Sequence, residues 1–189
     1  MMDDLTGKLV KLRPVRDEDF EYFASLRNDL RTQAWNQRMP PCFTAKKIKE
    51  RFEKITEKKD AGLWSIEAKD GKLIGYLNYE EGPQRLAATV GIATGMEAWG
   101  KDYAREAVEL VLEFLFVERG LQVVRLWTNS WNVRAVGLAK KLGFRDSIRL
   151  REEVVMGGKL YDALMMDMLR EEYYESRSLK EGAAVNQNR

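Results

Sequence analysis

The feature that most constrains the fold of this chain is a strand–glycine–helix–strand succession within residues 86–128. Residue spacing predicts a strand over residues 86–94, a turn at Gly100 and a helix over residues 103–118. The apolar positions of that helix recur every three or four residues and predict one buried face, made of Ala104, Ala107, Val108, Val111, Leu112 and Leu115. An apolar run over residues 123–128 follows, so we expect it to pair in parallel with the first strand.

The start of this helix is a candidate anion-binding site. The first turn of a helix has backbone N–H groups without helical partners, and the helix dipole adds partial positive charge there. Phosphate groups bind such helix ends without dedicated side chains. Residues 99–107 therefore suggest a phosphate-bearing ligand as a hypothesis, but a plain structural turn is the commoner interpretation of this local pattern, because many similar turns bind nothing.

The preceding part of the chain predicts two helices and an antiparallel meander. Alternating residues predict a strand over residues 8–13 that ends at Pro14, and the acids at 17–19 precede a helix that ends near Arg27. After a loop over residues 28–42, Thr44 is a predicted N-cap for a helix through Lys58. Strands over residues 63–68 and 73–79, joined by an Asp70–Gly71 turn, then pair with residues 86–94.

The C-terminal part predicts a helix and a hairpin. Asn132 is a predicted cap for a short helix that ends near Leu142, with Gly143 behind it. Strands over residues 144–155 and 160–169 turn at Gly157–Gly158. We find no internal repeat, so we expect one domain over residues 1–175 and a polar tail over residues 176–189 that frays.

Composition excludes several function classes. The chain of 189 residues is 44% hydrophobic and 33% charged, as expected for a soluble globular protein, and its net charge of +2 argues against broad nucleic-acid binding. Basic clusters at 46–59 and 145–151 are interleaved with acids, which is more typical of solvated faces than of polyanion sites. No apolar run has membrane-spanning length and no signal-peptide core is present. With Cys42 as its one cysteine, the chain is expected in the cytoplasm.

The chain contains no histidine, which limits its chemistry. Serine–histidine and cysteine–histidine nucleophile pairs are excluded in their usual form, and the commonest transition-metal ligand is missing, so we expect no metal site. A general base would have to be a carboxylate, a tyrosine, a lysine or a relayed water.

The order of these elements resembles the GNAT superfamily of acetyl-CoA-dependent N-acetyltransferases, and the resemblance spans about residues 9–169. It is closest to the subgroup of ribosomal-protein N-terminal and spermidine acetyltransferases. Three motifs carry it: Leu12-Arg13-Pro14 with Asp17-Glu18-Asp19; Gly91-Ile92 with Trp99-Gly100-Lys101 and Tyr103-Ala104-Arg105-Glu106-Ala107; and Asn132 with Arg134-Ala135 and Lys141-Leu142-Gly143-Phe144. The implied fold is an α/β GNAT fold, with a mixed, mostly antiparallel sheet of about seven strands, helices on both faces and a splayed central strand pair.

The resemblance implies acetyl-CoA as co-substrate. Backbone N–H groups from Gly100 to Ala104 would hold the pyrophosphate, so Trp99, Gly100, Lys101, Asp102, Tyr103 and Ala104 are candidate coenzyme-binding residues. Gly91, Ile92 and Ala93 would pair with pantetheine as though it were a strand and would hold the thioester carbonyl. Asn132 would contact the arm near its reactive end or serve only as a helix cap. Lys101, Arg134 and Lys140 are candidates for the ribose phosphate, or solvent contacts.

The chain departs from the family pattern at three positions. Glu97 stands where relatives have Gln or Arg, and Asp102 where they have Gly or Ala. A carboxylate in an anion cradle repels pyrophosphate, at a cost of about 1 kcal/mol if it is exposed. Ala139 stands where many relatives have a tyrosine that protonates the leaving thiolate, a role that water or Tyr161 could take here.

The remaining catalytic candidates are weaker. Glu80 is the candidate base, with Glu81 beside it, although a surface carboxylate is the ordinary role for either. Asp162 matches a recurring family acid or holds the last hairpin. Trp35, Tyr79 and Trp131 would line an acceptor pocket or pack in the core.

The leading hypothesis is direct acetyl transfer to a primary amine in a ternary complex. The acceptor would be a protein N-terminus, a polyamine or an amino sugar, with no nucleic-acid or membrane partner, and a homodimer is one assembly open to the chain. Two alternatives are a non-catalytic coenzyme or metabolite sensor and an interaction module that has lost coenzyme binding. Asp102 and Ala139 motivate the first of these.

Overall fold

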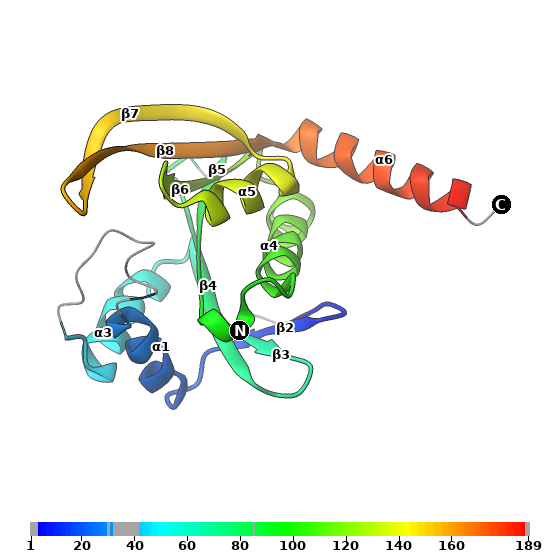
Figure 1. The fold of residues 1–189 in the computed structure, drawn as a ribbon. Coiled ribbons are helices and arrows are strands. Elements are labelled where there is room, and N and C mark those ends of the chain that lie inside the picture. The colour runs from blue at the N-terminus through cyan, green and yellow to red at the C-terminus, as the bar shows by residue number, and fades with distance from the viewer. Residues whose placement is uncertain (1–3, 30, 32–41, 85, 188–189) are drawn as a thin grey trace.

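A computed structural model of the protein describes residues 4–29, 31, 42–84 and 86–187, with side chains described through residue 178. Its sheet has eight strands in the order β1-β2-β3-β4-β5-β6-β8-β7 (Figure 1). The strands are β1 (Leu5–Thr6), β2 (Val10–Pro14), β3 (Ala61–Ala68), β4 (Leu73–Glu81), β5 (Ala87–Thr94), β6 (Val123–Asn129), β7 (Arg145–Met156) and β8 (Lys159–Leu169). The helices are α1 (Asp19–Asn28), α3 (Ala45–Thr56), a 3-10 turn η2 (Met96–Ala98), α4 (Tyr103–Glu113), a π-helical turn η3 (Phe114–Glu118), α5 (Val133–Leu142) and α6 (Arg170–Gln187).

The expected mixed, mostly antiparallel sheet is confirmed. The pair β5–β6 is parallel, with Ala87 opposite Val123 and Val90 opposite Leu126, and every other neighbouring pair is antiparallel. The sheet has one strand more than the predicted seven because β1, only two residues long, pairs with β2. A two-residue run carries no periodicity, so residue spacing could not reveal it.

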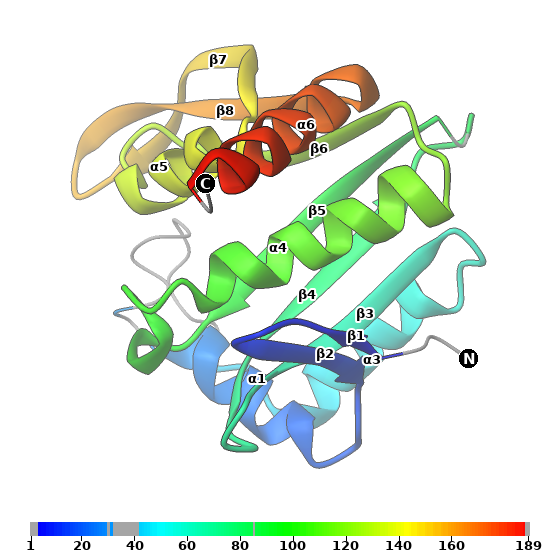
Figure 2. The same ribbon diagram turned by 90° about the vertical axis from the view of Figure 1, so that its right-hand side faces the viewer.

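Helices cover both faces of the sheet, as expected (Figures 1 and 2). On one face α1 and α3 pack around Phe23, Phe52 and Tyr76, whose rings lie 4.9–6.1 Å apart. On the other face α4 and α5 share the larger apolar core with Leu77 of β4. Because successive strand residues face opposite sides, Tyr76 and Leu77 belong to different cores.

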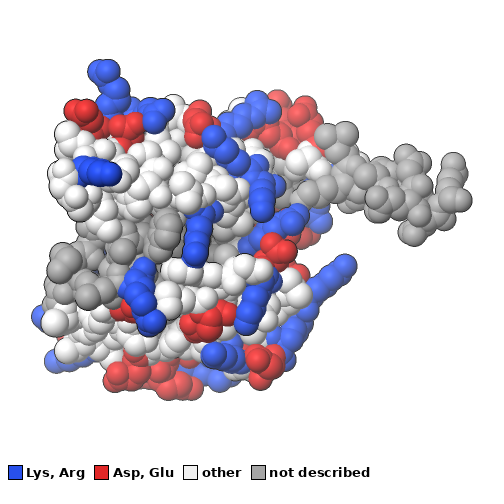
Figure 3. Space-filling model, in the orientation of Figure 1, with Lys and Arg blue, Asp and Glu red and all other residues white. Residues whose placement is uncertain are grey.

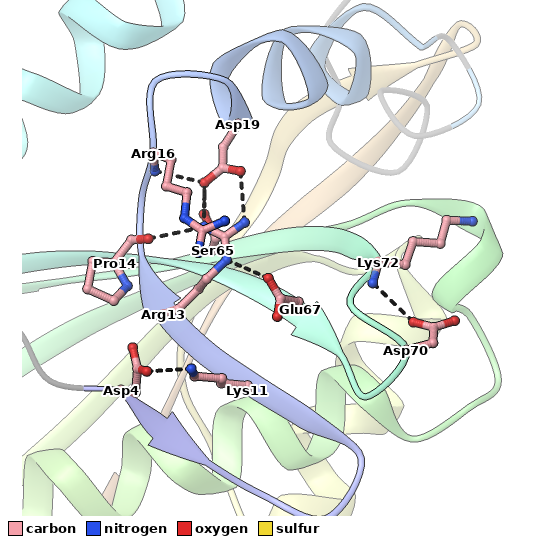
Figure 4. A network of polar contacts seen from close by, with 10 residues as sticks. All are labelled: Asp4, Lys11, Arg13, Pro14, Arg16, Asp19, Ser65, Glu67, Asp70 and Lys72. Carbon is pink, nitrogen blue, oxygen red and sulfur yellow. Dashed lines mark hydrogen bonds and ion pairs between the residues drawn. The ribbon is translucent and has the colours of Figure 1, made fainter.

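A buried ion pair joins β2 to α1 (Figure 4). The Arg13 guanidinium donates to both Asp19 carboxylate oxygens at 2.8 and 2.9 Å, and the Ser65 hydroxyl donates to Oδ2 at 2.6 Å. Both charged side chains are nearly inaccessible, and Arg13 also donates to Glu67 at 2.6 Å. The family motif around residues 12–19 therefore has a structural role, since it holds the first helix against the sheet.

The Glu106 carboxylate, in the first turn of α4, holds the β1–β2 turn against that helix. Its oxygens accept the backbone N–H groups of Lys8, Leu9 and Val10 at 2.8, 2.6 and 2.8 Å. Three donors to one ionised group make a strong contact. The motif over residues 103–107 therefore positions an edge hairpin as well as opening the helix.

We predict that Glu106→Ala lowers the free energy of unfolding by about 2 kcal/mol, because it leaves three backbone donors without their charged acceptor. Urea denaturation measures the loss, and amide hydrogen exchange at residues 8–10 should accelerate. Glu109→Ala is the matched control on the same helix, where an Arg105 pair at 3.4 Å is half-exposed. It should cost about 0.5 kcal/mol or less, and equal losses in the two variants would contradict the assignment.

The C-terminal segment differs from its prediction. Residues 176–189 are expected to fray, yet α6 continues the helix from Arg170 to Gln187. Its start is held by the Leu169 N–H, which donates to Glu172 at 2.9 Å, and by Tyr173 stacked on Phe116 at 4.9 Å. The following residues are mostly good helix formers, which favours continuation. Among the described residues, no helix is both long and apolar enough to cross a membrane.

Candidate active site

The sheet opens where β5 and β6 separate. Their pairing ends at Val90 and Leu126, after which β5 continues beside β4 as far as Thr94 and β6 continues beside β8 as far as Asn129. The expected splay of the central strand pair is therefore confirmed. Among the described residues, no strand neighbours the backbone groups of residues 91–94 that point away from β4, which suits pairing with an extended ligand.

Two adjoining clefts occupy this opening. The first, here the helix cleft, measures about 630 Å³ and lies between the ends of α1 and β5, the Gly100 loop, the first turn of α4, and α5. The second, here the sheet cleft, measures about 310 Å³ and lies between α1 and α3 on one side and β4, β5, β6 and α5 on the other. Six residues line both clefts: Arg27, Ile92, Ala93, Asn132, Ala135 and Leu138.

The loop before α4 reverses its direction with two left-handed residues. Gly100 has φ +74° and Asp102 has φ +58°. Asp102 is the N-cap residue, but its carboxylate makes no cap hydrogen bond, and its carbonyl accepts the Glu106 N–H at 3.0 Å. The side chain is exposed and leaves the N–H groups of the first turn to another acceptor. Glycine would adopt this left-handed backbone without the strain that Asp102 bears at φ +58°.

The helix cleft is electropositive. Its lining includes Arg27, Arg105, Arg134 and Lys141, against one acid, Asp102. The Arg134 guanidinium lies 4.1 Å from the centre of the Trp99 ring, a cation–π contact at the mouth of the cleft. Basic side chains cross the middle of the face drawn in Figure 3, whereas acids gather mostly toward its upper and lower margins. This charge distribution suits a phosphate-bearing ligand.

Most of the predicted coenzyme-binding residues meet at the clefts. Those that line one or both are Gly91, Ile92, Ala93, Trp99, Gly100, Asp102, Ala104 and Asn132. Lys101 and Tyr103 line neither, and the Lys101 ammonium lies 5.9 Å from the centre of the Tyr103 ring. Lys140 also lies outside and pairs with Asp146 at 3.4 Å. Asn132 is confirmed as a helix cap, because its Oδ1 accepts the Ala135 N–H at 3.1 Å.

Glu97, one of the two acids that depart from the family pattern, is hydrogen-bonded outside the clefts. The Tyr22 hydroxyl of α1 donates to Glu97 at 2.7 Å. Burial acts to raise the pKa of Glu97, but this hydrogen bond, a bond from its own backbone N–H and the charges of Lys72 and Lys101 together bring the pKa below its ordinary value. Glu97 is thus bound to α1 and lines neither cleft.

The structure does not bring the candidate base to the clefts. Glu80 lies opposite Thr89, on the far side of Val90 from the opening, and its carboxylate pairs with Lys58 at 2.5 Å. Glu81 is buried and pairs with Arg119 at 2.7 Å. β4 runs antiparallel to β5, so the C-terminal end of β4, which holds Glu80 and Glu81, lies beside the start of β5. It therefore lies away from the point where β5 separates from β6.

The other aromatic and acidic candidates differ in their positions and contacts. Tyr161 is half-buried, and its ring meets the Trp131 ring edge-on with 5.1 Å between the ring centres. Trp131 directly precedes Asn132 in the chain. Tyr79 is buried in the core between Trp64 and Phe114, which confirms the packing interpretation. Trp35 lies outside the described residues. Asp162 holds the last hairpin, because it accepts the Glu152 N–H at 2.9 Å and the Arg149 guanidinium at 2.5 Å.

Sequence reasoning missed several lining residues. Lys141 lies two helical turns after Arg134, so their spacing of seven could have placed both on one face of α5. Arg27, Arg51 and Tyr76 come from α1, α3 and β4, and no local pattern links them. Ala139 lines the sheet cleft and is buried, so position 139 presents only a methyl group there.

The split sheet and its electropositive helix N-terminus together define an acyltransferase with a GNAT fold. The chain belongs to this family, since the acetyltransferase (GNAT) domain matches residues 10–145. It is an N-acetyltransferase and acts on amine substrates.

The matches with known proteins extend over most of both chains. The prophage-derived uncharacterized N-acetyltransferase YokL of Bacillus subtilis is 29% identical, over 89% of this chain and 94% of its own. The spermidine N(1)-acetyltransferase of Escherichia coli K12 is 25% identical, over 87% and 88%. The spermidine N-acetyltransferase of Vibrio cholerae, solved with CoA and spermine, has a TM-score of 0.79 at 22% identity, over 89% of this chain and 99% of that one.

Proposed function

We propose that this chain transfers the acetyl group of acetyl-CoA directly to a primary amine within a ternary complex. The observation that carries the proposal is the opening between β5 and β6, which leads to the left-handed Gly100 loop and the start of α4. One continuous site there offers an unpaired strand edge to an amide-rich arm and helix N–H groups to phosphates. The structure of the Vibrio cholerae relative with CoA supports the choice of coenzyme.

The coenzyme-binding residues follow from the two clefts. The pyrophosphate would lie against the backbone from Gly100 to Ala104, with Arg134 and Lys141 as the nearby cations. The pantetheine arm would pair with residues 91–93. The same backbone N–H groups would stabilise the charge that develops on the thioester oxygen.

The transfer needs no covalent intermediate on the protein. The amine nitrogen attacks the thioester carbonyl carbon, the carbon–sulfur bond breaks, and its electron pair leaves on the coenzyme thiolate. The chain has no histidine, and Cys42, its one cysteine, is exposed and lines neither cleft. These facts support direct attack over a ping-pong route.

Proton transfers are assigned to water, with one tyrosine as the alternative donor. Glu80 has no part in the proposal, because its pair with Lys58 lies outside both clefts. The amine proton passes to water. Water is the proposed donor to the departing thiolate, with Tyr161 as the alternative, because Tyr161 packs on Trp131 next to Asn132 but itself lines neither cleft. A Tyr161→Phe variant that loses turnover while keeping its acetyl-CoA affinity would support the tyrosine.

A non-catalytic coenzyme sensor is the second candidate, favoured by Ala139 in the sheet cleft where many relatives have tyrosine. Calorimetric titration with acetyl-CoA and thiol release with a panel of amines separate the two. Binding with amine-dependent thiol release supports the enzyme. Binding without release supports the sensor, and no binding excludes both.

We predict that Asp102→Gly tightens acetyl-CoA binding about fivefold. It removes a carboxylate whose repulsion of the pyrophosphate costs about 1 kcal/mol of binding free energy. Glycine also relieves the left-handed backbone at φ +58°, so the melting temperature should rise. Glu152→Gly is the matched control, since Glu152 has φ +55° in β7 and lines neither cleft. It should raise stability without changing affinity, and a weaker Asp102→Gly complex would show that the repulsion argument is wrong.

A further inference from the structure

The wall of the sheet cleft that faces α1 and α3 is cationic. Arg27 of α1 and Arg51 of α3 both line it, together with Tyr76 and Asn78 of β4. Thr128, Asn129 and Asn132 add neutral polar groups on the opposite side. No aspartate or glutamate belongs to the described lining of this cleft, so the charge it offers a ligand is positive.

The two arginines lie near one buried hydroxyl. Tyr76 is only 5% exposed and lines the sheet cleft together with both arginines. Burial raises the pKa of Tyr76, and the charges of Arg27 and Arg51 both oppose that rise. Both guanidinium groups therefore act on the same point in the cleft. Arg27 is further held over the Phe43 ring, 5.7 Å from its centre.

Three acids that lie within two residues of Arg27, Arg51 or Asn78 in the chain pair with other cations. Asp29, at the end of α1, pairs with Arg31 at 2.9 Å, and Glu80 pairs with Lys58 at 2.5 Å. Glu53, two residues after Arg51, faces Lys49 at 3.9 Å. By sequence, residues 32–41 contain an arginine and no acid. A polycationic acceptor would thus meet two guanidinium groups and no carboxylate in the described wall.

We propose that the acceptor is a primary amine that also carries an anionic group, a carboxylate or a phosphate, which binds Arg27 and Arg51 in the sheet cleft. This inference rests on the acetyl transfer proposed above and narrows its acceptor. Guanidinium forks match the oxygens of carboxylates and phosphates, whereas like charges brought together disfavour a polyamine. The chain would then share a fold with the spermidine acetyltransferases while taking an acceptor of opposite charge.

Matched amine pairs test the proposal. Leucine and leucinamide differ in the carboxylate, glucosamine and its 6-phosphate differ in the phosphate, and spermidine represents polyamines. With thiol release as the assay, we expect the anionic member of at least one pair to have a kcat/KM about tenfold or more above its neutral partner and above spermidine. The pair that responds identifies the anion. Higher kcat/KM for spermidine, or equal values within both pairs, would overturn the proposal.

Arg51→Gln tests whether the preference for anionic amines arises in the sheet cleft, because Arg51 lines the sheet cleft and not the helix cleft. It should lower kcat/KM about tenfold for the anionic amine and by less than about twofold for the neutral amine, so that the preference for the anionic amine falls, while the acetyl-CoA affinity changes little. Lys54→Gln removes an exposed charge from the same helix outside the clefts and should change none of these. Equal losses for both amines in Arg51→Gln would count against the assignment.

A binding measurement separates the two proposals. Each amine is titrated calorimetrically into protein saturated with CoA. Tighter binding of the anionic amines without thiol release from acetyl-CoA would retain the anion site and reject the transferase. Thiol release with spermidine alone would retain the transferase and reject the anion site.

Discussion

Replacing Gly100 by valine should weaken acetyl-CoA binding on the order of a hundredfold, about 2.7 kcal/mol. Two effects combine. Gly100 has φ +74°, a conformation that a β-branched residue adopts only with strain, and a Cβ built there meets no protein atom within 4 Å. The new side chain would therefore project into the space from which phosphate must approach the loop. Calorimetric titration with acetyl-CoA measures the loss.

Gly120→Val is the matched control for backbone strain. Gly120 has φ +67°, has equally open surroundings and follows the π-helical turn at the opposite end of the same helix. It should lower the free energy of unfolding by about as much as Gly100→Val does, and it should leave the affinity for acetyl-CoA unchanged. Equal loss of affinity in the two variants, or unchanged affinity in Gly100→Val, would show that the loop is no coenzyme cradle.

Replacing Asp19 by alanine should lower the free energy of unfolding by about 3–5 kcal/mol, the typical cost of leaving one charge of a buried pair without its partner. Arg13 would keep the half-exposed Glu67 but lose both bonds to Asp19, and Ser65 would lose its acceptor. Urea denaturation measures the change. Asp17→Ala is the control two residues away, where the side chain is 80% exposed and pairs with Lys49, and it should cost less than about 1 kcal/mol.

The same carboxylate makes stability depend on pH. Burial acts to raise the pKa of Asp19, but hydrogen bonds from Arg13, the Arg16 N–H and Ser65, together with the charge of Arg13, lower it below its ordinary value. A lowered pKa in the folded state means that the stabilisation is complete above the unfolded-state pKa. It is lost as the pH falls below about 4 and through the folded-state value.

Asp19→Asn tests this linkage. The variant should be destabilised at pH 7, and its stability should fall less steeply than that of the wild type below about pH 4, because the titrating group is gone. Parallel stability curves for the two proteins between pH 5 and pH 3, in urea denaturation, would show that Asp19 does not supply this dependence.

Sequence patterns predicted the elements that depend on neighbours along the chain. Thr44 caps α3 by accepting the Lys47 N–H at 3.2 Å, and Asn132 caps α5. Gly71 takes φ +83° in the predicted turn, and Gly143 takes φ +102° after α5. Each is set by bonds spanning three or four residues, which is why a local pattern was sufficient.

Contacts between distant segments escaped the same reasoning. The three N–H groups that Glu106 accepts lie almost a hundred residues earlier in the chain. Arg13 and Asp19 are near in sequence, yet Ser65 completes their pair from another strand. Glu80 illustrates the reverse error. It was predicted as the base because it is a carboxylate, but its position in β4 places it outside the clefts.

Local sequence determined the parallel strand pair, the glycine loop and the capped helices, because hydrophobic periodicity and capping operate within a few residues. The folded arrangement alone decided which side chains surround the opening. Arg27, Arg51 and Tyr76 meet there because burial of two apolar cores presses α1 and α3 against one face of the sheet and α4 against the other. That packing depends on the summed apolar area of the whole chain.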